Sequence, residues 1–288
     1  MDSYFTNREL TRPYTSGKMM ADLTLEEISK LPADLTDAER TSPFAKYYDE
    51  PLAELQPQMK EAVEKGPLSE EEMYMPSEAG PILLGGSKNY PLNGYGVLAN
   101  GVGYSTSLMH YDNITDEMIA WYRDHFAVTE DPAVRTLFYK TWYPGKHLIH
   151  FEDGIVEDFG WGYCLQEMNW DIFNMQSHFG VKKEDIPRLD PDCIAVTGLG
   201  GKCTLVSDPS DNSYTCMIQY TKQTKTGRDL CVHYWNGVRL YPDGRIEVAP
   251  NVGREEMQER MKNMMLHAMQ EDCNEKKHIE EFWNETHQ

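Results

Sequence analysis

The sequence has little that would cross-link its parts or anchor it to a membrane. Its six cysteines all lie after residue 160, and no two of them form a Cys-x-x-Cys motif. This spacing argues against a disulfide framework and against a thiolate zinc site, and it predicts reduced thiols. Charged residues break up the first 20 positions, so no apolar run reaches the length of a signal peptide, and no segment is apolar enough to span a bilayer. We therefore expect a soluble cytoplasmic protein.

Basic residues are also scarce. Lysine and arginine number 27 against 47 aspartates and glutamates, which gives a formal net charge of −20. Such a surface repels phosphate backbones and anionic lipid, so we expect neither nucleic acid nor a membrane as a partner. The 288 residues, with 40% hydrophobic content, suffice for one large domain with an appendage.

The first 79 residues differ in texture from the rest of the chain. They are rich in Leu, Glu, Ala, Lys and Pro. Short helices are predicted over Asp37–Tyr48 and Leu52–Lys65, and the prolines around them keep each one short. We place the boundary near Gly80, with a helical region over residues 1–79 and the main domain over residues 80–288.

The middle of the chain is mostly β-like. Glycine-rich strand patterns cover Gly94–Ser107, and a helix with acidic residues in its first turn is predicted over Asp116–Phe126. Apolar runs predict further strands over Thr136–Trp142, His147–Phe151 and Ile155–Phe159. The order of elements, with short helices first, then strands and then a terminal helix, indicates an α+β fold.

Glu157 is the acidic residue of this region that we expect to point inward. It lies in the last of these β-like runs and has apolar neighbours, whereas Glu152 and Asp153 precede a turn glycine.

A β-hairpin is predicted further along the chain. The strands Tyr214–Gln223 and Asp229–Leu240 flank a turn that we place at Thr226-Gly227. With that turn, Gln219 lies opposite Tyr234, and both side chains are expected to face the same cavity.

The last stretch of the chain, Val252–Glu285, contains no proline and predicts one long helix. Its apolar stripe continues onto Glu271, and His267 lies one helical turn earlier on the same face. A carboxylate on a core-facing stripe is costly unless it is compensated, and a divalent metal shared with the imidazole would compensate it. A solvated ion pair is the alternative, because such pairs are common on exposed helices. The apolar positions of the stripe are Met257, Met261, Met264 and Ala268.

These elements together suggest a curled antiparallel sheet wrapped around the terminal helix. A cavity between the sheet and the helix would suit a flat or elongated apolar ligand with polar groups at its rim. The chain is rich in tyrosine, tryptophan and methionine, with 17, 6 and 16 of each, which fits such a cavity.

Four stretches of the sequence resemble the diacetylphloroglucinol hydrolase and phloretin hydrolase family. They are Ile114–His125, Tyr139–His147, Val156-Glu157 and the His267-x-x-x-Glu271 pair, and the likeness extends over about Gly94 to Asn274. Members of this family are zinc enzymes that cleave a carbon–carbon bond between a phloroglucinol ring and an acyl group.

The resemblance implies a metal site and a fold. The matching zinc ligands would be His125, Glu157, His267 and Glu271, with Glu152 as the alternative to Glu157. The fold would be a helix-grip, Bet v 1-like domain, with a helical N-terminal part that helps to form a homodimer.

The resemblance also implies a substrate site. Tyr234 matches a family tyrosine that binds substrate, and Gln219 stands where we expect a histidine, which leaves the substrate preference open. Tyr234 and His147 are the candidates for hydrogen bonding to ring hydroxyls or for proton transfer, and a structural contact is the alternative for His147.

We expect hydrolysis of an acylated phenol, with phloretin giving phloroglucinol and 3-(4-hydroxyphenyl)propionate. In that chemistry zinc activates water and polarises the carbonyl, and the ring leaves because its hydroxyl groups allow protonation at carbon. Hydrolysis of mono- or diacetylphloroglucinol is one alternative. A metal-free helix-grip protein that only carries an aromatic ligand is the other.

Overall fold

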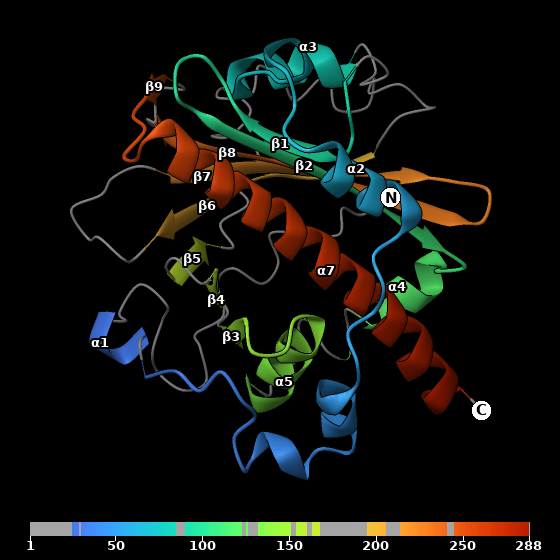
Figure 1. The fold of residues 1–288 in the computed structure, drawn as a ribbon. Coiled ribbons are helices and arrows are strands. Elements are labelled where there is room, and N and C mark those ends of the chain that lie inside the picture. Colours follow the sequence, from blue (N-terminus) through green and yellow to red (C-terminus); the bar gives the residue numbers. More distant parts are fainter. Residues whose placement is uncertain are drawn as a thin grey trace.

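A computed structural model describes residues 25–28, 30–84, 90–122, 125, 132–150, 154–159, 163–167, 195–205, 214–240 and 245–287. In this part of the chain the expected α+β class is confirmed: short helices come first, antiparallel strands follow, and one long helix ends the chain (Figure 1). The helices are α1 (Leu25–Ile28), η2 (Glu39–Thr41), η3 (Pro43–Asp49), α2 (Pro57–Lys65), η4 (Glu70–Glu72), η5 (Pro76–Glu78), α3 (Ala79–Leu84), α4 (Asp116–Tyr122), α5 (Pro132–Trp142) and α7 (Arg254–Thr286). The strands are β1 (Gly94–Val97), β2 (Gly103–Asp112), β3 (His147–His150), β4 (Gly154–Asp158), β5 (Tyr163–Glu167), β6 (Ala195–Leu205), β7 (Tyr214–Gln223), β8 (Gly227–Leu240) and β9 (Ile246–Val248).

The strands form one antiparallel sheet in the order β1-β2-β8-β7-β6-β5-β4-β3, with β9 paired to β8. The expected curl around the terminal helix is not found, because the described strands follow an open path from β1 to β3. The reason lies in the segment before β1. Figure 1 shows α7 across one side of the sheet and α3 on the other, so both faces are covered without the sheet closing on itself.

Alternating side chains of β8 pack into two hydrophobic cores, one on each face of the sheet. Leu230 and Val232 join the core beneath α7, whereas Cys231 and Trp235 join a second core that includes Tyr74. The Trp235 indole Nε1 donates a hydrogen bond to the Tyr74 carbonyl at 2.5 Å. This two-residue alternation is what a strand with two buried faces requires.

The terminal helix α7 confirms the predicted element almost to its ends. All four apolar positions of the predicted stripe are at most 2% exposed. The same stripe carries His267, which is 6% exposed, into the interior. The described residues contain no helix that is both long and apolar enough to cross a membrane.

The segment before residue 79 packs against the rest of the chain. The Tyr47 ring contacts Phe282 of α7 at a centroid distance of 4.4 Å, and Met59 belongs to the core beneath α7. A buried ion pair joins Lys140 of α5 to Glu39, with Nζ and Oε2 3.0 Å apart. The N-terminal helices therefore brace both α5 and α7.

The predicted strand over Thr136–Trp142 is wrong, because these residues form most of helix α5. Every residue from Arg135 to Thr141 is buried. A helix that is buried all round shows no polar stripe, so its sequence cannot be distinguished by periodicity from a buried strand.

The hairpin is confirmed, but its predicted register is wrong. Thr224 N–H donates to the Gly227 carbonyl at 2.9 Å, which puts the two-residue turn one position earlier than expected. Tyr234 therefore pairs with Met217, and Gln219 pairs with Val232. The turn moved because Gly227 belongs to β8, where it pairs with Asp112 of β2.

Candidate metal centre

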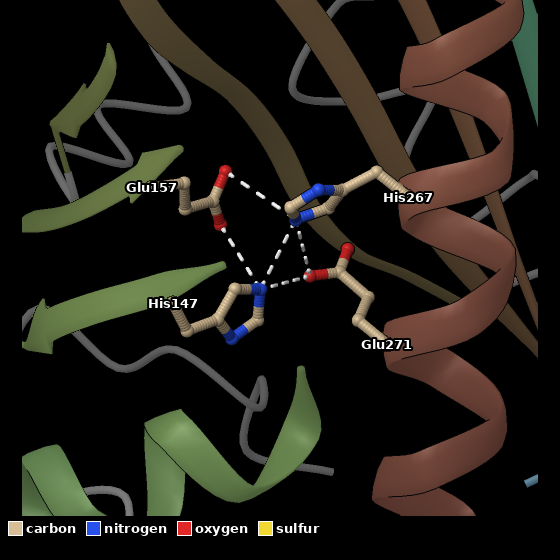
Figure 2. A group of neighbouring side chains, drawn as sticks. All are labelled: His147, Glu157, His267 and Glu271. Carbon is tan, nitrogen blue, oxygen red and sulfur yellow. Dashed lines mark hydrogen bonds and ion pairs between the residues drawn. The ribbon is translucent and has the colours of Figure 1, made fainter. Parts of the chain in front are cut away.

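Four side chains from three elements meet between the sheet and α7 (Figure 2). His147 begins β3 and pairs in register with Glu157 of β4, which sets the two side chains side by side. His267 and Glu271 lie one turn apart on α7 and face these strands. Each residue offers one ligand atom, and the four atoms lie within 4.8 Å of one another.

The nitrogen and oxygen atoms of the group point at a common centre. The Nε2 atoms of His147 and His267 are 3.1 Å apart, and His147 Nε2 is 3.0 Å from Glu271 Oε2. His267 Nε2 lies 3.7 Å from Glu271 Oε2 and 3.9 Å from Glu157 Oε2. These separations would allow all four residues to contact one small cation.

Burial dominates the electrostatics of the group. It lowers the pKa values of His147 and His267, and it raises the pKa of Glu157 to about 7 and that of Glu271 to about 8. Without a cation, both imidazoles are therefore neutral and the carboxyl groups tend to hold protons at neutral pH.

Tyr139 fixes the orientation of two of the four residues. His147 Nδ1 donates to the Tyr139 carbonyl at 2.8 Å, which leaves Nε2 as the nitrogen that carries the lone pair toward the centre. The Tyr139 hydroxyl donates to Glu157 Oε1. The Tyr139 ring also stacks on the His147 imidazole, with centroids 4.0 Å apart and planes 15° apart.

The donor set fits a divalent metal ion. Two imidazole nitrogens and two carboxylates are ligand types that such ions accept in a four-coordinate site, and a cation would take the place of the protons that burial favours. A second group, formed by Glu50, His278 and Glu281, is a weaker candidate. The Lys277 ammonium lies 2.5 Å from Glu50 Oε2 and already compensates that carboxylate.

The structure brings together three of the four ligands expected from the resemblance, and it puts His147 in place of His125. The His125 side chain is exposed, its Nδ1 lies 2.9 Å from the Trp121 carbonyl, and its ring stacks on the Trp121 indole. His125 comes after α4 (Asp116–Tyr122) in the sequence, and it is not one of the four side chains that meet. Glu152 lies outside the described residues.

The sequence does not predict that His147 joins this group, because its place depends on the pairing of β3 with β4. The signal for it is the strand predicted at His147, ten residues before Glu157, which suits a short hairpin. Nothing in the sequence points to the contacts of Tyr139, because its segment is predicted as a strand.

Tyr234 lies on the side of β8 that packs against the core beneath α7. Burial raises the pKa of its phenol, and the charges of Glu271 and Glu157 raise it further. Among the described residues the Tyr234 hydroxyl makes no hydrogen bond. The side chain of Gln219 lies outside what is described. Asp272, which the sequence did not single out, is 7% exposed, and its Oδ2 has no partner among the described residues.

Comparison with known proteins gives two matches. The DAPG hydrolase PhiG domain family matches residues 81–158, which include His147 and Glu157. A phloretin hydrolase of Eubacterium ramulus is 27% identical over 111 residues, which is 38% of this chain and 39% of that protein. The chain thus matches well under half of this relative's length. Both matches agree with the resemblance seen in the sequence: residues 81–158 are similar to the DAPG hydrolase domain, and a part of the chain is similar to a phloretin hydrolase.

Proposed function

We propose that the protein is a zinc-dependent hydrolase that cleaves the carbon–carbon bond between a phloroglucinol ring and its acyl group. The observation that carries the proposal is the convergence of His147, Glu157, His267 and Glu271 in a buried site. Two of these residues lie in the segment that matches the DAPG hydrolase domain. Zinc accepts imidazole nitrogens and carboxylate oxygens as ligands, and it can expand to a fifth position that a water molecule or a substrate oxygen would take.

Bound zinc would supply an activated water and polarise the acyl carbonyl. The protein's own residues then orient the ring and handle its proton. Tyr234 is next to the centre and its hydroxyl is available, so it can donate a hydrogen bond to a ring hydroxyl or pass a proton to the ring carbon. Burial and the charges of Glu271 and Glu275 raise the pKa of Asp272, so this residue would offer a hydrogen bond to a second ring hydroxyl as the protonated acid; its Oδ2 has no partner among the described residues. His147, expected from the sequence to act in catalysis, serves here as a ligand.

Phloretin is the preferred substrate in this proposal, because the curated relative is a phloretin hydrolase. Mono- and diacetylphloroglucinol are the alternatives within the same chemistry, since the matched domain is that of DAPG hydrolase. We also propose that the sheet and α7 are a variant of the helix-grip arrangement, and that residues 1–79 contribute to a homodimer.

The metal can be tested with two histidine variants. We expect about one zinc per chain in the purified protein, and we expect His147→Ala to lose most of it because one of four ligands is gone. His125→Ala is the matched control, since His125 lies outside the group, and it should keep its zinc. Elemental analysis decides the point. Full zinc in His147→Ala together with loss in His125→Ala would restore the ligand set expected from the sequence, and a wild-type protein without metal would favour the metal-free binder.

The reaction can be tested with a pair of substrates. Phloretin should be cleaved, whereas an analogue without the ring hydroxyls that flank the acyl group should be left nearly intact, because its ring cannot tautomerise and leave. Product chromatography measures both rates. Equal rates would rule out ring protonation as a step, and a failure to cleave phloretin, with diacetylphloroglucinol cleaved, would shift the substrate to the alternative.

A further inference from the structure

We infer that Tyr139 is the positioning residue of the metal centre, through which helix α5 sets the geometry of two ligands on neighbouring strands. The inference deepens the proposed function and rests on it. Tyr139 is not itself a candidate ligand. Its hydroxyl donates a hydrogen bond to Glu157, and its carbonyl accepts one from His147.

The hydroxyl controls Glu157. The hydroxyl donates to Oε1, which lies 3.7 Å from His147 Nε2, while Oε2 lies 3.9 Å from His267 Nε2. The hydrogen bond therefore holds the buried carboxylate in an orientation in which both of its oxygens face the two histidines (Figure 2).

The carbonyl and the ring control His147. The hydrogen bond from Nδ1 fixes the tautomer, and the ring stacked at 4.0 Å fixes the plane of the imidazole. The next residue, Lys140, is tied to Glu39 and to the Asp34 carbonyl, with Nζ–O distances of 3.0 and 2.9 Å. Tyr139 is therefore held by α5 and by the N-terminal segment as well as by its own contacts.

Two substitutions separate the contributions of this side chain. Tyr139→Phe keeps the stacked ring and the carbonyl, and removes only the hydrogen bond to Glu157. Tyr139→Leu also removes the ring. Tyr143→Phe is the matched control, because Tyr143 directly follows α5, its ring is 4.8 Å from that of His267, and its hydroxyl makes no hydrogen bond among the described residues.

The readout is zinc affinity, measured by competition with a chelator, together with thermal unfolding of the metal-free proteins. We expect affinity to fall about 10- to 100-fold in Tyr139→Phe and further in Tyr139→Leu, with the Tyr143→Phe value close to wild type. If Tyr139 acts through Glu157, the loss caused by Tyr139→Phe should largely disappear in a Glu157→Gln background, because that background has already lost the oriented carboxylate.

The outcomes are distinct. Wild-type affinity in Tyr139→Phe overturns the inference and leaves the proposed function intact. An equal loss in the Glu157→Gln background also overturns it, because the effect would then be a general weakening of the fold. A wild-type protein that binds no zinc overturns the proposed function and, with it, the inference. A visible absorption spectrum of the cobalt-substituted protein that changes in Tyr139→Phe and not in Tyr143→Phe supports the assignment independently of affinity.

Discussion

At the scale of single residues, the candidate centre shows which signals are local in the sequence. His267 and Glu271 could be predicted because both lie on one helical stripe, and Glu157 because it stands in an apolar run. His147 could not be placed as a ligand, because that role depends on the register between β3 and β4. Only the resemblance suggests His125 as a ligand. No pattern in the neighbouring sequence predicts that its side chain faces the core.

The raised carboxyl pKa values give the centre a defined pH dependence. Burial raises the pKa of Glu157 to about 7 and that of Glu271 to about 8, so protons compete with zinc at and below neutral pH. The lowered pKa values of the two histidines keep the imidazoles neutral there. Zinc affinity should therefore rise with pH between about 6 and 8, by up to about tenfold per unit for each proton displaced.

Chelator competition at several pH values tests this, with Glu157→Gln as the variant that should flatten the slope by one proton. A slope that is zero in the wild-type protein would mean that both carboxyl groups are already ionised in the metal-free site.

Tyr234 provides a residue-scale test of catalysis. Tyr234→Phe keeps the packing of the ring against the core beneath α7 and removes one hydroxyl. We expect turnover of phloretin to fall on the order of 10- to 1,000-fold, with zinc content and unfolding midpoint close to wild type, because the hydroxyl acts on the ring and not on the metal. Steady-state kinetics on the zinc-loaded protein measures this. If Tyr234→Phe turns over phloretin at the wild-type rate, Tyr234 only packs against the core, and Asp272 becomes the candidate for the hydrogen bond to the ring.

At the scale of elements, the sequence predicts best where a long pattern repeats. Helix α7 and strands β7 and β8 follow from their periodicity and agree with the structure within a few residues. Helix α5 does not, because it is buried on all sides. The predicted position of the hairpin turn is wrong for a different reason. Gly227 is predicted as a turn residue because glycine favours turns, but it belongs to β8 and its backbone pairs with that of β2.

Gly227 yields the element-scale prediction. A β-carbon built on Gly227 would lie 2.0 Å from the carbonyl oxygen of Tyr111, so Gly227→Ala must push β2 and β8 apart. We expect a loss in the free energy of unfolding of about 1–3 kcal/mol or more. Gly253→Ala is the control, because nothing lies within 4 Å of the added carbon. It should cost well under about 1 kcal/mol, the scale of a change at a helix N-cap.

Urea unfolding of both variants decides the point. Equal midpoints for the two alanine variants would show that the strands can separate without cost and that Gly227 has no packing role.

At the scale of the whole molecule, the composition predicts two parts of the chain, and both parts contribute side chains to one hydrophobic core. Tyr47 and Met59 of the N-terminal segment belong to the same buried cluster as Met109 of β2 and Met269 and Phe282 of α7. The buried pair between Glu39 and Lys140 joins the same segment to the helix that holds Tyr139. A change of composition near Gly80 therefore marks a change in secondary structure, and the packing favours a single cooperative unit that includes the metal centre.

Removing residues 1–79 tests this unity. The remaining chain, residues 80–288, would expose the apolar surfaces of α7 and β2 that Tyr47 and Met59 cover, and α5 would lose the segment to which Lys140 is tied. Apolar surface that returns to water no longer stabilises the fold, and a typical domain is stable by only about 5–15 kcal/mol. We therefore expect the shortened chain to show no cooperative thermal transition by circular dichroism and to bind zinc at least tenfold more weakly than the full chain, because its ligands are no longer held in place. If residues 80–288 instead melt cooperatively and bind zinc as the full chain does, the boundary near Gly80 separates two independent folding units. The N-terminal segment would then be free for another role, such as contact with a second copy of the chain.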